Sequence, residues 1–245
     1  IASDMDATLL DEQSQLPADF EETIHALAEL GIRFAPASGR PLYTLEAMFP
    51  TLQDELVFIG DNGGAIRWKG QNLFTSEMSP EGWRALNRLT REQGDIAVLC
   101  GLESAYVERP FAVHDAVLRH FYTKIEYVDR LEDVTAPADK FTIYLPQHNA
   151  QQAYDTIYAS QRSIYSVAVA GECWVDIMNP GVHKGAALQT LGQLWGLPSE
   201  SMMAFGDTYN DAEMLRTAKY GFLMENGSAP LRQKVPFLAP SHREA

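Results

Sequence analysis

The chain has 245 residues, 46% of them hydrophobic and 21% charged, an ordinary mixture for a globular protein with one large domain or two smaller ones. Its formal net charge of -14 repels polyanions, so we expect neither nucleic acid nor an anionic membrane surface as a partner. A small anionic substrate remains compatible with this charge, because a bound cation can invert the field inside a single cleft.

The chain contains two cysteines, Cys100 and Cys173, and neither has the spacing of a metal-ligand motif. Each lies in an apolar, strand-like run, so both are predicted to be small buried hydrophobes, and nothing in the pattern calls for a disulfide. No run in the given sequence approaches the roughly 18 apolar residues of a membrane span, and we expect no signal peptide before the first motif. We therefore expect a cytoplasmic protein. Residues 1–3 resemble the end of a strand, whose beginning is expected to precede the given sequence.

The first third of the chain alternates predicted strands and helices. In chain order the predicted elements are a helix at 17–30, a strand at 32–37, a helix at 41–48, a strand at 56–60, and a hairpin with strands at 65–68 and 71–74. Together with the short strand before the first motif, this alternation predicts a parallel sheet with right-handed crossovers.

From about residue 79 the pattern changes to a mixture of helices and strands. The predicted helices are at 80–93, 113–122 and 149–161, and the predicted strands are at 96–100, 105–109, 141–145, 164–170 and 173–178. About one hundred residues are enough for a separate domain. We therefore predict an inserted α+β domain over residues 79–179.

The α/β alternation returns after this insertion. The predicted elements are a helix at 185–195, a strand at 202–206, and two edge strands at 220–224 and 237–239. The simplest architecture is one discontinuous α/β core domain, formed by residues 1–78 and 180–245, which the second domain interrupts.

Four segments carry residues suited to chemistry, and three of them follow a predicted parallel strand. They are Asp4-x-Asp6, Ser38, Lys184 at the start of a helix, and Asp207-x-x-Asn210-Asp211. In open α/β sheets ligands bind at the carboxyl ends of the strands. We therefore expect these segments, which span two hundred residues of sequence, to meet at one rim of the sheet.

The carboxylates of these segments predict a metal site formed by Asp4, Asp6, Asp207 and Asp211. Two like charges about 4 Å apart repel by roughly 4 kcal/mol at an effective dielectric constant near 20. Such a cluster needs a hard cation, and ligands that are all oxygen favour Mg²⁺ over zinc. Lys184 supplies a second positive charge.

The spacing of the first motif suggests how the site could act on a phosphate ester. An extended backbone would point Asp4 and Asp6 to the same side, because they are two residues apart. Asp4 could then attack phosphorus while Asp6 donates a proton to the leaving oxygen and later accepts one from water. Ser38 and Lys184 could bind the equatorial phosphate oxygens, where charge develops in the transition state.

These motifs resemble those of the haloacid dehalogenase (HAD) superfamily. The matching patterns are Asp-x-Asp-x-Thr-Leu-Leu from Asp4, Ser-Gly-Arg from Ser38, Gly-Val-x-Lys-Gly around Lys184, and Gly-Asp-x-x-Asn-Asp around Asp207. The pattern Asn-Gly-Gly-Ala from Asn62, the Asn-Pro-Gly-Val-His-Lys-Gly run from Asn179 and the place of the insertion resemble its Cof-type (subclass IIB) phosphatases. The resemblance covers nearly the whole chain and is weakest inside the insertion.

The resemblance implies a Rossmann-like core with a parallel sheet and a type II cap domain at 79–179. It implies Mg²⁺ held by Asp4, by the backbone carbonyl of Asp6 and by Asp207. By the same resemblance, Asp211 supports the metal through water or a second shell of contacts, and Asn210 is a neighbour of the phosphate or of Lys184. The resemblance also implies that Thr8 orders the motif loop. The predicted topology places Gly39, Arg40 and Asn179 near the rim, where they could contact substrate, and the same is expected of Asn62, because its Asn-Gly turn ends the third strand.

The chain departs from the family pattern in two places. Ala7 stands where the family usually has glycine, and the segment that usually follows the final strand is missing or diverged. Neither departure removes a charged residue of the predicted site.

The leading hypothesis is an Mg²⁺-dependent phosphatase that hydrolyses a small phosphorylated metabolite, above all a sugar phosphate, through an aspartyl-phosphate on Asp4. The alternatives are a phosphomutase of the same superfamily and a non-catalytic metabolite-binding or regulatory protein on the same fold. The cap is expected to choose the substrate and to close over it. We expect a monomer or a weak homodimer.

Overall fold

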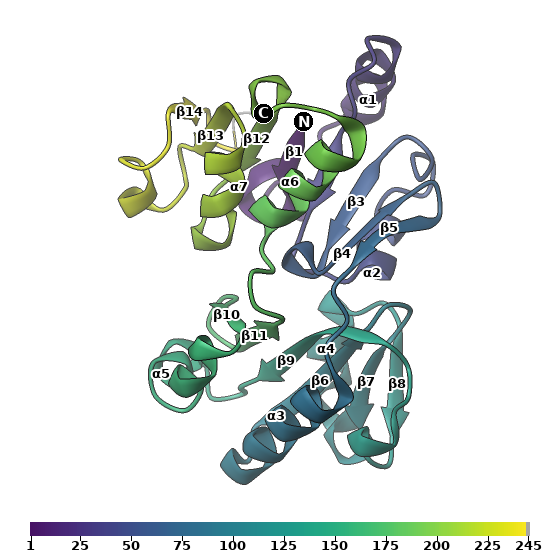
Figure 1. Ribbon diagram of the computed structural model, residues 1–245, viewed down its shortest axis with the longest axis vertical. Coiled ribbons are helices and arrows are strands. Elements are labelled where there is room, and N and C mark those ends of the chain that lie inside the picture. The colour runs from purple at the N-terminus through teal and green to yellow at the C-terminus, as the bar shows by residue number, and fades with distance from the viewer. Residues whose placement is uncertain (244–245) are drawn as a thin grey trace.

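The computed structural model describes residues 1–243 and has two lobes, each built on one β-sheet (Figure 1). The core lobe contains both ends of the described chain, and two connecting segments lead from it to the cap lobe. This arrangement confirms the predicted fold class, a Rossmann-like α/β core with a parallel sheet plus an inserted α+β unit. No helix within residues 1–243 is both long enough and apolar enough to cross a membrane.

The core sheet has eight strands, and its six parallel strands form one continuous block. In spatial order they are β14 (Phe237–Ala239), β13 (Tyr220–Met224), β12 (Met203–Gly206), β1 (Ala2–Asp4), β2 (Ala35–Ala37) and β3 (Val57–Gly60), followed by the antiparallel strands β4 (Ala65–Trp68) and β5 (Gln71–Thr75). Since β12, β1, β2 and β3 are consecutive neighbours and parallel, their carboxyl ends lie at the same edge.

Helices cover both faces of the core sheet. They are α1 (Phe20–Glu29) and α2 (Leu42–Ala47) on one face, and α6 (Lys184–Trp195) and α7 (Ala212–Thr217) on the other. The alternation of side chains along β3 explains both layers. Val57 and Ile59 pack with Leu188 of α6, whereas Phe58 between them packs with Leu45 of α2.

The cap sheet has six strands, and all of them come from residues 96–178. In spatial order they are β10 (Ser166–Val169), β11 (Trp174–Met178), β9 (Ala138–Tyr144), β6 (Ile96–Gly101), β7 (Ala105–Glu108) and β8 (Ile125–Val128). The division of the chain into 1–78, 79–179 and 180–245 stays a prediction.

The two faces of the cap sheet differ in chemistry. Helices α3 (Pro80–Gln93) and α5 (Ala150–Asp155) cover one face, where Phe141 and Ile143 are buried. The alternate positions of β9 point to the other face and carry Lys140 and Thr142, and α4 (Asp115–Phe121) packs on part of that face.

Several predicted elements need correction. The helix expected at 113–122 is shorter because Pro110 opens a 3₁₀ segment, Arg109–His114, before α4. The helix expected at 149–161 ends at Asp155, after which β-branched residues and a second 3₁₀ segment, Ala159–Ser163, follow. Strand β8 was not predicted, since three of its four side chains are only half-buried and give a weak pattern.

One strand predicted at the edge lies inside the sheet. Strand β13 pairs with both β12 and β14, so only β14 is an edge strand on that side. A single sequence cannot distinguish the two positions here, because both strands are short and apolar.

The cysteines differ from each other in exposure. Cys100 is buried as predicted, but Cys173 is only half-buried and lines the cavity described below, which corrects its assignment as a buried hydrophobe. Both thiols are free.

Candidate active site

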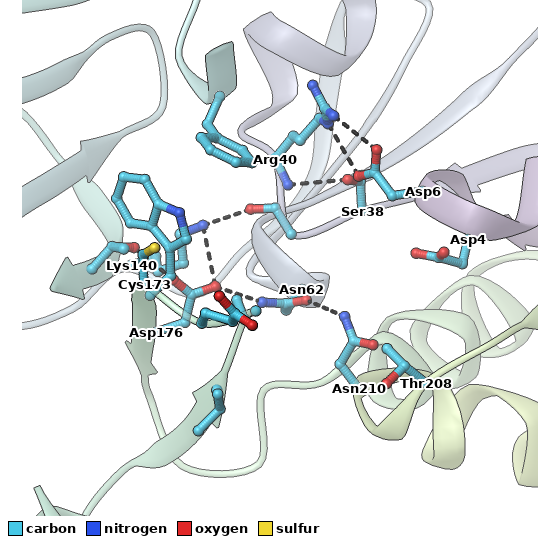
Figure 2. Close-up of a pocket in the computed structure, with 18 of the residues that line it drawn as sticks. Asp4, Asp6, Ser38, Arg40, Asn62, Lys140, Cys173, Asp176, Thr208 and Asn210 are labelled. Atoms are coloured by element: carbon cyan, nitrogen blue, oxygen red, sulfur yellow. Dashed lines mark hydrogen bonds and ion pairs between the residues drawn. The ribbon is translucent and has the colours of Figure 1, made fainter. Parts of the chain in front are cut away.

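A cavity of about 690 Å³ lies at the carboxyl edge of the core sheet, and both lobes line it (Figure 2). The core contributes residues that follow four neighbouring strands: Asp4, Asp6 and Ala7; Ser38, Gly39, Arg40 and Pro41; Asn62; and Asp207, Thr208 and Asn210. The opposite wall comes from the cap and includes Phe121, Tyr122, Lys140, Thr142, Trp174 and Asp176. The expected meeting of the motifs at one rim is therefore what the structure shows.

Lys184 holds two of the predicted acidic residues in place. It is the first residue of α6, and its side chain is wholly buried. Its ammonium donates to the carboxylate of Asp4 and, over 2.7 Å, to Oδ1 of Asp211. Because Lys184 lies behind Asp4 and does not line the cavity, the geometry supports a role in orienting Asp4 more than the expected contact with phosphate oxygens.

Asp211 is fixed by donors on both of its oxygens. Its Oδ2 atom accepts from the backbone N–H groups of Asp207 and Thr208, at 3.1 Å each, while Oδ1 accepts from Lys184. Its side chain is fully buried. Asp211 therefore orders the turn that carries Asp207.

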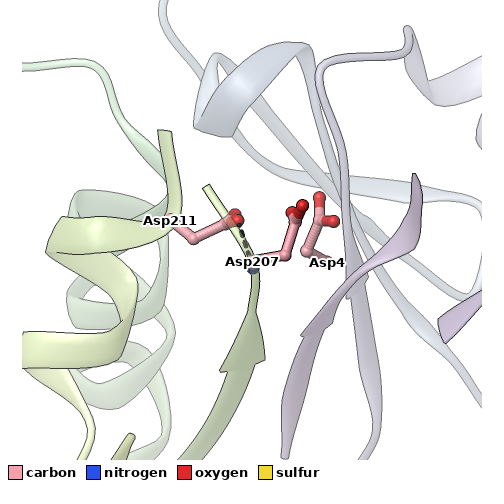
Figure 3. Close-up of side chains that lie close together, drawn as sticks. All are labelled: Asp4, Asp207 and Asp211. Carbon is pink, nitrogen blue, oxygen red and sulfur yellow. Dashed lines mark hydrogen bonds between the residues drawn. The ribbon is translucent and has the colours of Figure 1, made fainter. Parts of the chain in front are cut away.

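Asp4, Asp207 and Asp211 each offer a carboxylate oxygen within 4.8 Å of the others (Figure 3). Burial raises the pKa of Asp4 to about 8, with the Asp211 carboxylate adding to the shift and Lys184 opposing it. Burial and Asp211 likewise raise the pKa of Asp207 to about 6. One ammonium thus faces three carboxylates, and this excess of oxygen donors fits a hard divalent cation.

The first motif does not continue as an extended strand. Strand β1 ends at Asp4, Met5 begins a helical turn, and Ala7 has a positive φ of 61°. The predicted extended backbone is therefore wrong, although Asp4 and Asp6 both line the same cavity. The Asp4 side chain is 9% exposed, whereas Asp6 is 57% exposed and pairs with Arg40 at 2.8 Å.

One of the two departures from the family pattern, Ala7, lies in this loop. Ala7 takes the left-handed conformation in which glycine is usually favoured. Its carbonyl accepts a hydrogen bond of 2.8 Å from Nδ2 of Asn226, which comes from the segment after β13. Thr8 is buried beside it, and its hydroxyl has no partner among the described residues.

The turn of Ser38, Gly39 and Arg40 follows β2. The Ser38 hydroxyl is almost fully buried and accepts from the backbone N–H of Arg40 at 3.1 Å. The Arg40 guanidinium binds Asp6 and donates to the carbonyl of His120 in the cap at 3.4 Å. Figure 2 shows Arg40 and Asp6 facing each other beside Ser38.

Asn62 and Asn210 form a link across the core side of the cavity. The Asn210 amide donates to Oδ1 of Asn62 at 3.3 Å, and the Asn62 amide donates to Asp176 of the cap at 2.9 Å. The partner of Asn210 is therefore Asn62, and not Lys184. The Asn210 oxygen is buried without a hydrogen-bond partner in residues 1–243.

The cap residues Lys140, Thr142 and Asp176 were missed by the sequence analysis. A signal was available, because polar residues alternate with Phe141 and Ile143 in an otherwise apolar strand. The strand predicted at 141–145 began one residue too late to include Lys140. His183, next to Lys184, accepts from the N–H of Ala186 as the N-cap of α6.

The fold and the site together define an α/β enzyme whose acidic cleft is covered by a cap. The family model of the haloacid dehalogenase-like hydrolases matches residues 1–245. The chain belongs to this family, and within it to the Cof-type phosphatases that its motifs resemble.

Two curated relatives match over nearly their whole length. An Escherichia coli protein named 5-amino-6-(5-phospho-D-ribitylamino)uracil phosphatase YbjI is 31% identical, over 99% of this chain and 90% of the relative. A protein of Cronobacter sakazakii named HMP-PP phosphatase is 30% identical, over 97% of this chain and 88% of the relative.

Solved structures share the two-lobed fold. A Streptococcus mutans protein superposes with a TM-score of 0.89 and 29% identity, covering 99% of this chain and 93% of that one. A structure described as a HAD subclass IIB sugar phosphatase gives a TM-score of 0.83 at 20% identity, covering 99% and 94%. At that identity the second comparison concerns the fold alone.

Proposed function

We propose that the protein is an Mg²⁺-dependent phosphatase that hydrolyses a small phosphorylated metabolite, a sugar phosphate above all, through an aspartyl-phosphate on Asp4. The observation that carries the proposal is the position of Asp4: its carboxylate lies at the end of β1, held by buried Lys184, and it faces the cavity. A carboxylate placed in this way can attack phosphorus and form a covalent intermediate.

The residues around Asp4 supply the acid/base group and the phosphate-binding groups. Asp6 is exposed to the cavity and is the proposed acid that protonates the leaving oxygen and then accepts a proton from water. The turn of Ser38, Gly39 and Arg40, called the phosphate turn below, and Asn210 offer a hydroxyl, backbone groups and an amide for the phosphate oxygens. Arg40, which holds Asp6 at 2.8 Å, would orient this acid.

Mg²⁺ would be held by the carboxylates of Asp4 and Asp207 and the carbonyl of Asp6, with Asp211 supporting them through water. When bound, it would neutralise charge that develops on the transferring phosphoryl group. The pKa values of Asp4 and Asp207, about 8 and about 6, are consistent with a site whose charge balance includes a cation.

The test is turnover of an aryl phosphate with added Mg²⁺. We expect EDTA to abolish turnover and Asp4→Asn to reduce kcat by about 10³-fold or more, since the nucleophile is lost. Asp19→Asn, the same substitution at an exposed position before α1, should have no effect. Acid quenching during turnover should leave a phosphorylated peptide that contains Asp4. Full activity in Asp4→Asn would exclude the mechanism.

The substrate is best sought with a panel of sugar phosphates, phosphorylated polyols and cofactor phosphates. The cavity of about 690 Å³ has room for a leaving group much larger than phosphate, and pockets of 300–1,000 Å³ usually bind metabolite-sized ligands. The names of the two curated relatives refer to a phosphoribitylamino-uracil and to HMP-PP, so both compounds belong in the panel.

The same panel tests the alternatives. A phosphomutase would isomerise a substrate without releasing phosphate, and a non-catalytic binding protein would turn over none of the compounds. The cytoplasmic location and the monomeric or weakly dimeric state stay predictions, of which size-exclusion chromatography with light scattering tests the second.

A further inference from the structure

A lysine of the cap reaches into the core lobe. Lys140 lies on β9, its side chain is only 2% exposed, and its ammonium donates to the carbonyl of Gly39 at 2.6 Å. The same ammonium lies 3.0 Å from the carboxylate of Asp61, which follows core strand β3, and 3.6 Å from that of Asp176 on cap strand β11. Figure 2 shows Lys140 between Asp176 and the backbone that leads to Ser38.

The surroundings keep Lys140 charged. Burial alone would lower its pKa, but Asp176 and Asp61 raise it well above the ordinary value. An ammonium has three donors, and three oxygens from three segments lie around it. Burying such a group is costly unless its partners are in place, so the arrangement is complete only when the two lobes are docked.

A second link runs beside the first. Asp176 accepts from Thr142 of the cap at 2.8 Å and from Asn62 of the core at 2.9 Å, and Asn62 in turn accepts from Asn210. Two cap residues, Lys140 and Asp176, thus contact or connect to the loops that follow β2, β3 and β12. These are three of the four loops that form the core side of the cavity.

We infer that Lys140 is a positioning residue for the phosphate turn: by holding the Gly39 carbonyl, it fixes the turn in its binding conformation only while the cap is docked. The inference rests on the proposed function, in which this turn binds the phosphoryl group. Gly39 lies between Ser38, which lines the cavity, and Arg40, which holds Asp6, so a shift of its carbonyl would move both. Cap docking and assembly of the phosphate site are then a single event.

The experiment compares three variants of the full chain. Lys140→Met removes the ammonium and keeps much of the side-chain volume. Lys140→Met combined with Asp61→Asn also removes one carboxylate, which restores the original excess of one negative charge among Lys140, Asp61 and Asp176. Arg91→Met is the matched control, because Arg91 of α3 pairs with two cap carboxylates, Glu108 and Glu132, away from the cavity.

Three quantities are measured for each variant: the melting temperature, kcat and KM for an aryl phosphate, and the dissociation constant of inorganic phosphate by calorimetry. For Lys140→Met we expect kcat/KM to fall by about 10²-fold, as for other small displacements of a reacting group. The dissociation constant of phosphate should rise about tenfold, the effect of losing one well-placed polar contact. Arg91→Met should match the wild type in both quantities.

The double variant distinguishes positioning from simple stabilisation. If Lys140 only stabilises the interface, restoring the charge balance should recover melting temperature, kcat/KM and phosphate affinity together, and that result would overturn the inference. We expect the melting temperature to recover while kcat/KM and phosphate affinity stay low, because the Gly39 carbonyl still lacks its donor.

Phosphate binding separates this inference from the proposed function. If the wild type hydrolyses no phosphate ester but binds inorganic phosphate, weaker binding in Lys140→Met would uphold the positioning role although the proposed function fails. Equal phosphate affinity in the wild type and Lys140→Met, or no binding by either, would overturn the inference whatever the activity.

Discussion

Ion pairs around Lys184 illustrate how a single residue can hold several charges of a site together. Its buried ammonium is shared by Asp4 and Asp211, and burial would lower its pKa if these two carboxylates did not raise it. The wider group contains three carboxylates, those of Asp4, Asp207 and Asp211, and this one ammonium. Removal of the Lys184 ammonium should therefore reduce stability as well as activity.

Lys184→Met should destabilise the metal-free protein by about 3–5 kcal/mol, the usual effect of leaving a buried charge without its partner. Added Mg²⁺ should recover part of this loss, because a bound cation would again balance the carboxylates. The measurement is the free energy of urea unfolding with EDTA and with Mg²⁺. The double variant Lys184→Met/Asp211→Asn is the control, and it should lose less free energy of unfolding than Lys184→Met alone. An unchanged free energy of unfolding in Lys184→Met would contradict the prediction.

Asp139 presents the opposite case of a buried carboxyl without a hydrogen-bond partner in the described part of the chain. Burial and the nearby Asp61 carboxylate raise its pKa well above the ordinary value. The folded state therefore keeps a proton that the unfolded chain releases above about pH 4. Stability is fully present below that pH and is lost progressively as the pH rises.

Asp139→Asn should remove this loss of stability at high pH, because asparagine does not ionise. We expect the variant to be more stable than the wild type by about 1–3 kcal/mol at pH 8, and the difference should vanish near pH 4. Calorimetric melting across this pH range measures the effect, with Asp133→Asn, an exposed aspartate of the cap, as the control. A gain that is the same at both pH values would show that ionisation of Asp139 is not its cause.

Among the elements, helix α6 has an unusual N-cap residue, His183. The Nδ1 atom of His183 accepts from the N–H of Ala186 at 3.0 Å, and only an unprotonated Nδ1 can do so. Burial lowers the pKa of His183, with Glu213 opposing the shift and Arg216 adding to it. Because the folded state disfavours the charged ring, stability should fall as the pH drops below the unfolded value of about 6.5.

His183→Asn should keep the N-cap hydrogen bond of α6, since an amide oxygen accepts the same hydrogen bond at every pH. The stability of this variant should therefore no longer depend on acid in this way. His183→Ala should cost about 1 kcal/mol at pH 8. Urea unfolding at pH 8 and pH 5.5 tests both, and His25→Asn, on an exposed histidine of α1, is the control. If the wild type and His183→Asn lose equal stability between these pH values, His183 is not the source of the acid sensitivity.

The elements that the sequence predicted well are those with a strong local pattern. Apolar runs bounded by glycine and aspartate predicted the parallel strands, and their alternation with helices predicted that Asp4, Ser38 and Asp207 meet. The turn at Met5 could not be predicted, because it depends on a left-handed alanine tied to Asn226 from the other end of the chain. The partners of Lys140 lie about 35 to 100 residues away in sequence, and only the packing of two lobes brings them together.

At the scale of the whole molecule, the lobes have separate hydrophobic cores and meet mainly through polar contacts. Besides the Lys140 and Asp176 contacts, Thr44 of the core accepts from the N–H of Thr123 at 3.1 Å. Polar interfaces of this kind usually permit relative motion of domains. The two connecting segments in Figure 1 are then the place where such motion would be controlled.

Asn179 connects these two segments through hydrogen bonds. It begins the second segment, directly after β11, and its amide donates to the carbonyl of Glu77 at 2.8 Å and to the hydroxyl of Ser76 at 3.1 Å in the first segment, which follows β5. The predicted topology placed Asn179 near the rim of the site, where it could contact substrate, but its side chain does not line the cavity. Its contacts restrict how far the segments can separate, and so how the cap can move.

Asn179→Ala should therefore favour open arrangements of the cap without weakening either hydrophobic core. We expect the melting temperature to change little and KM for an aryl phosphate to rise about three- to tenfold, since each lost hydrogen bond contributes about 1 kcal/mol. Small-angle scattering without ligand should show a larger radius of gyration, and saturating phosphate should reduce the difference. Gln71→Ala, at the exposed start of β5 at the far edge of the core sheet, serves as the control. If Asn179→Ala raised KM while its radius stayed that of the wild type, the amide would act on the substrate and not on the opening of the cap.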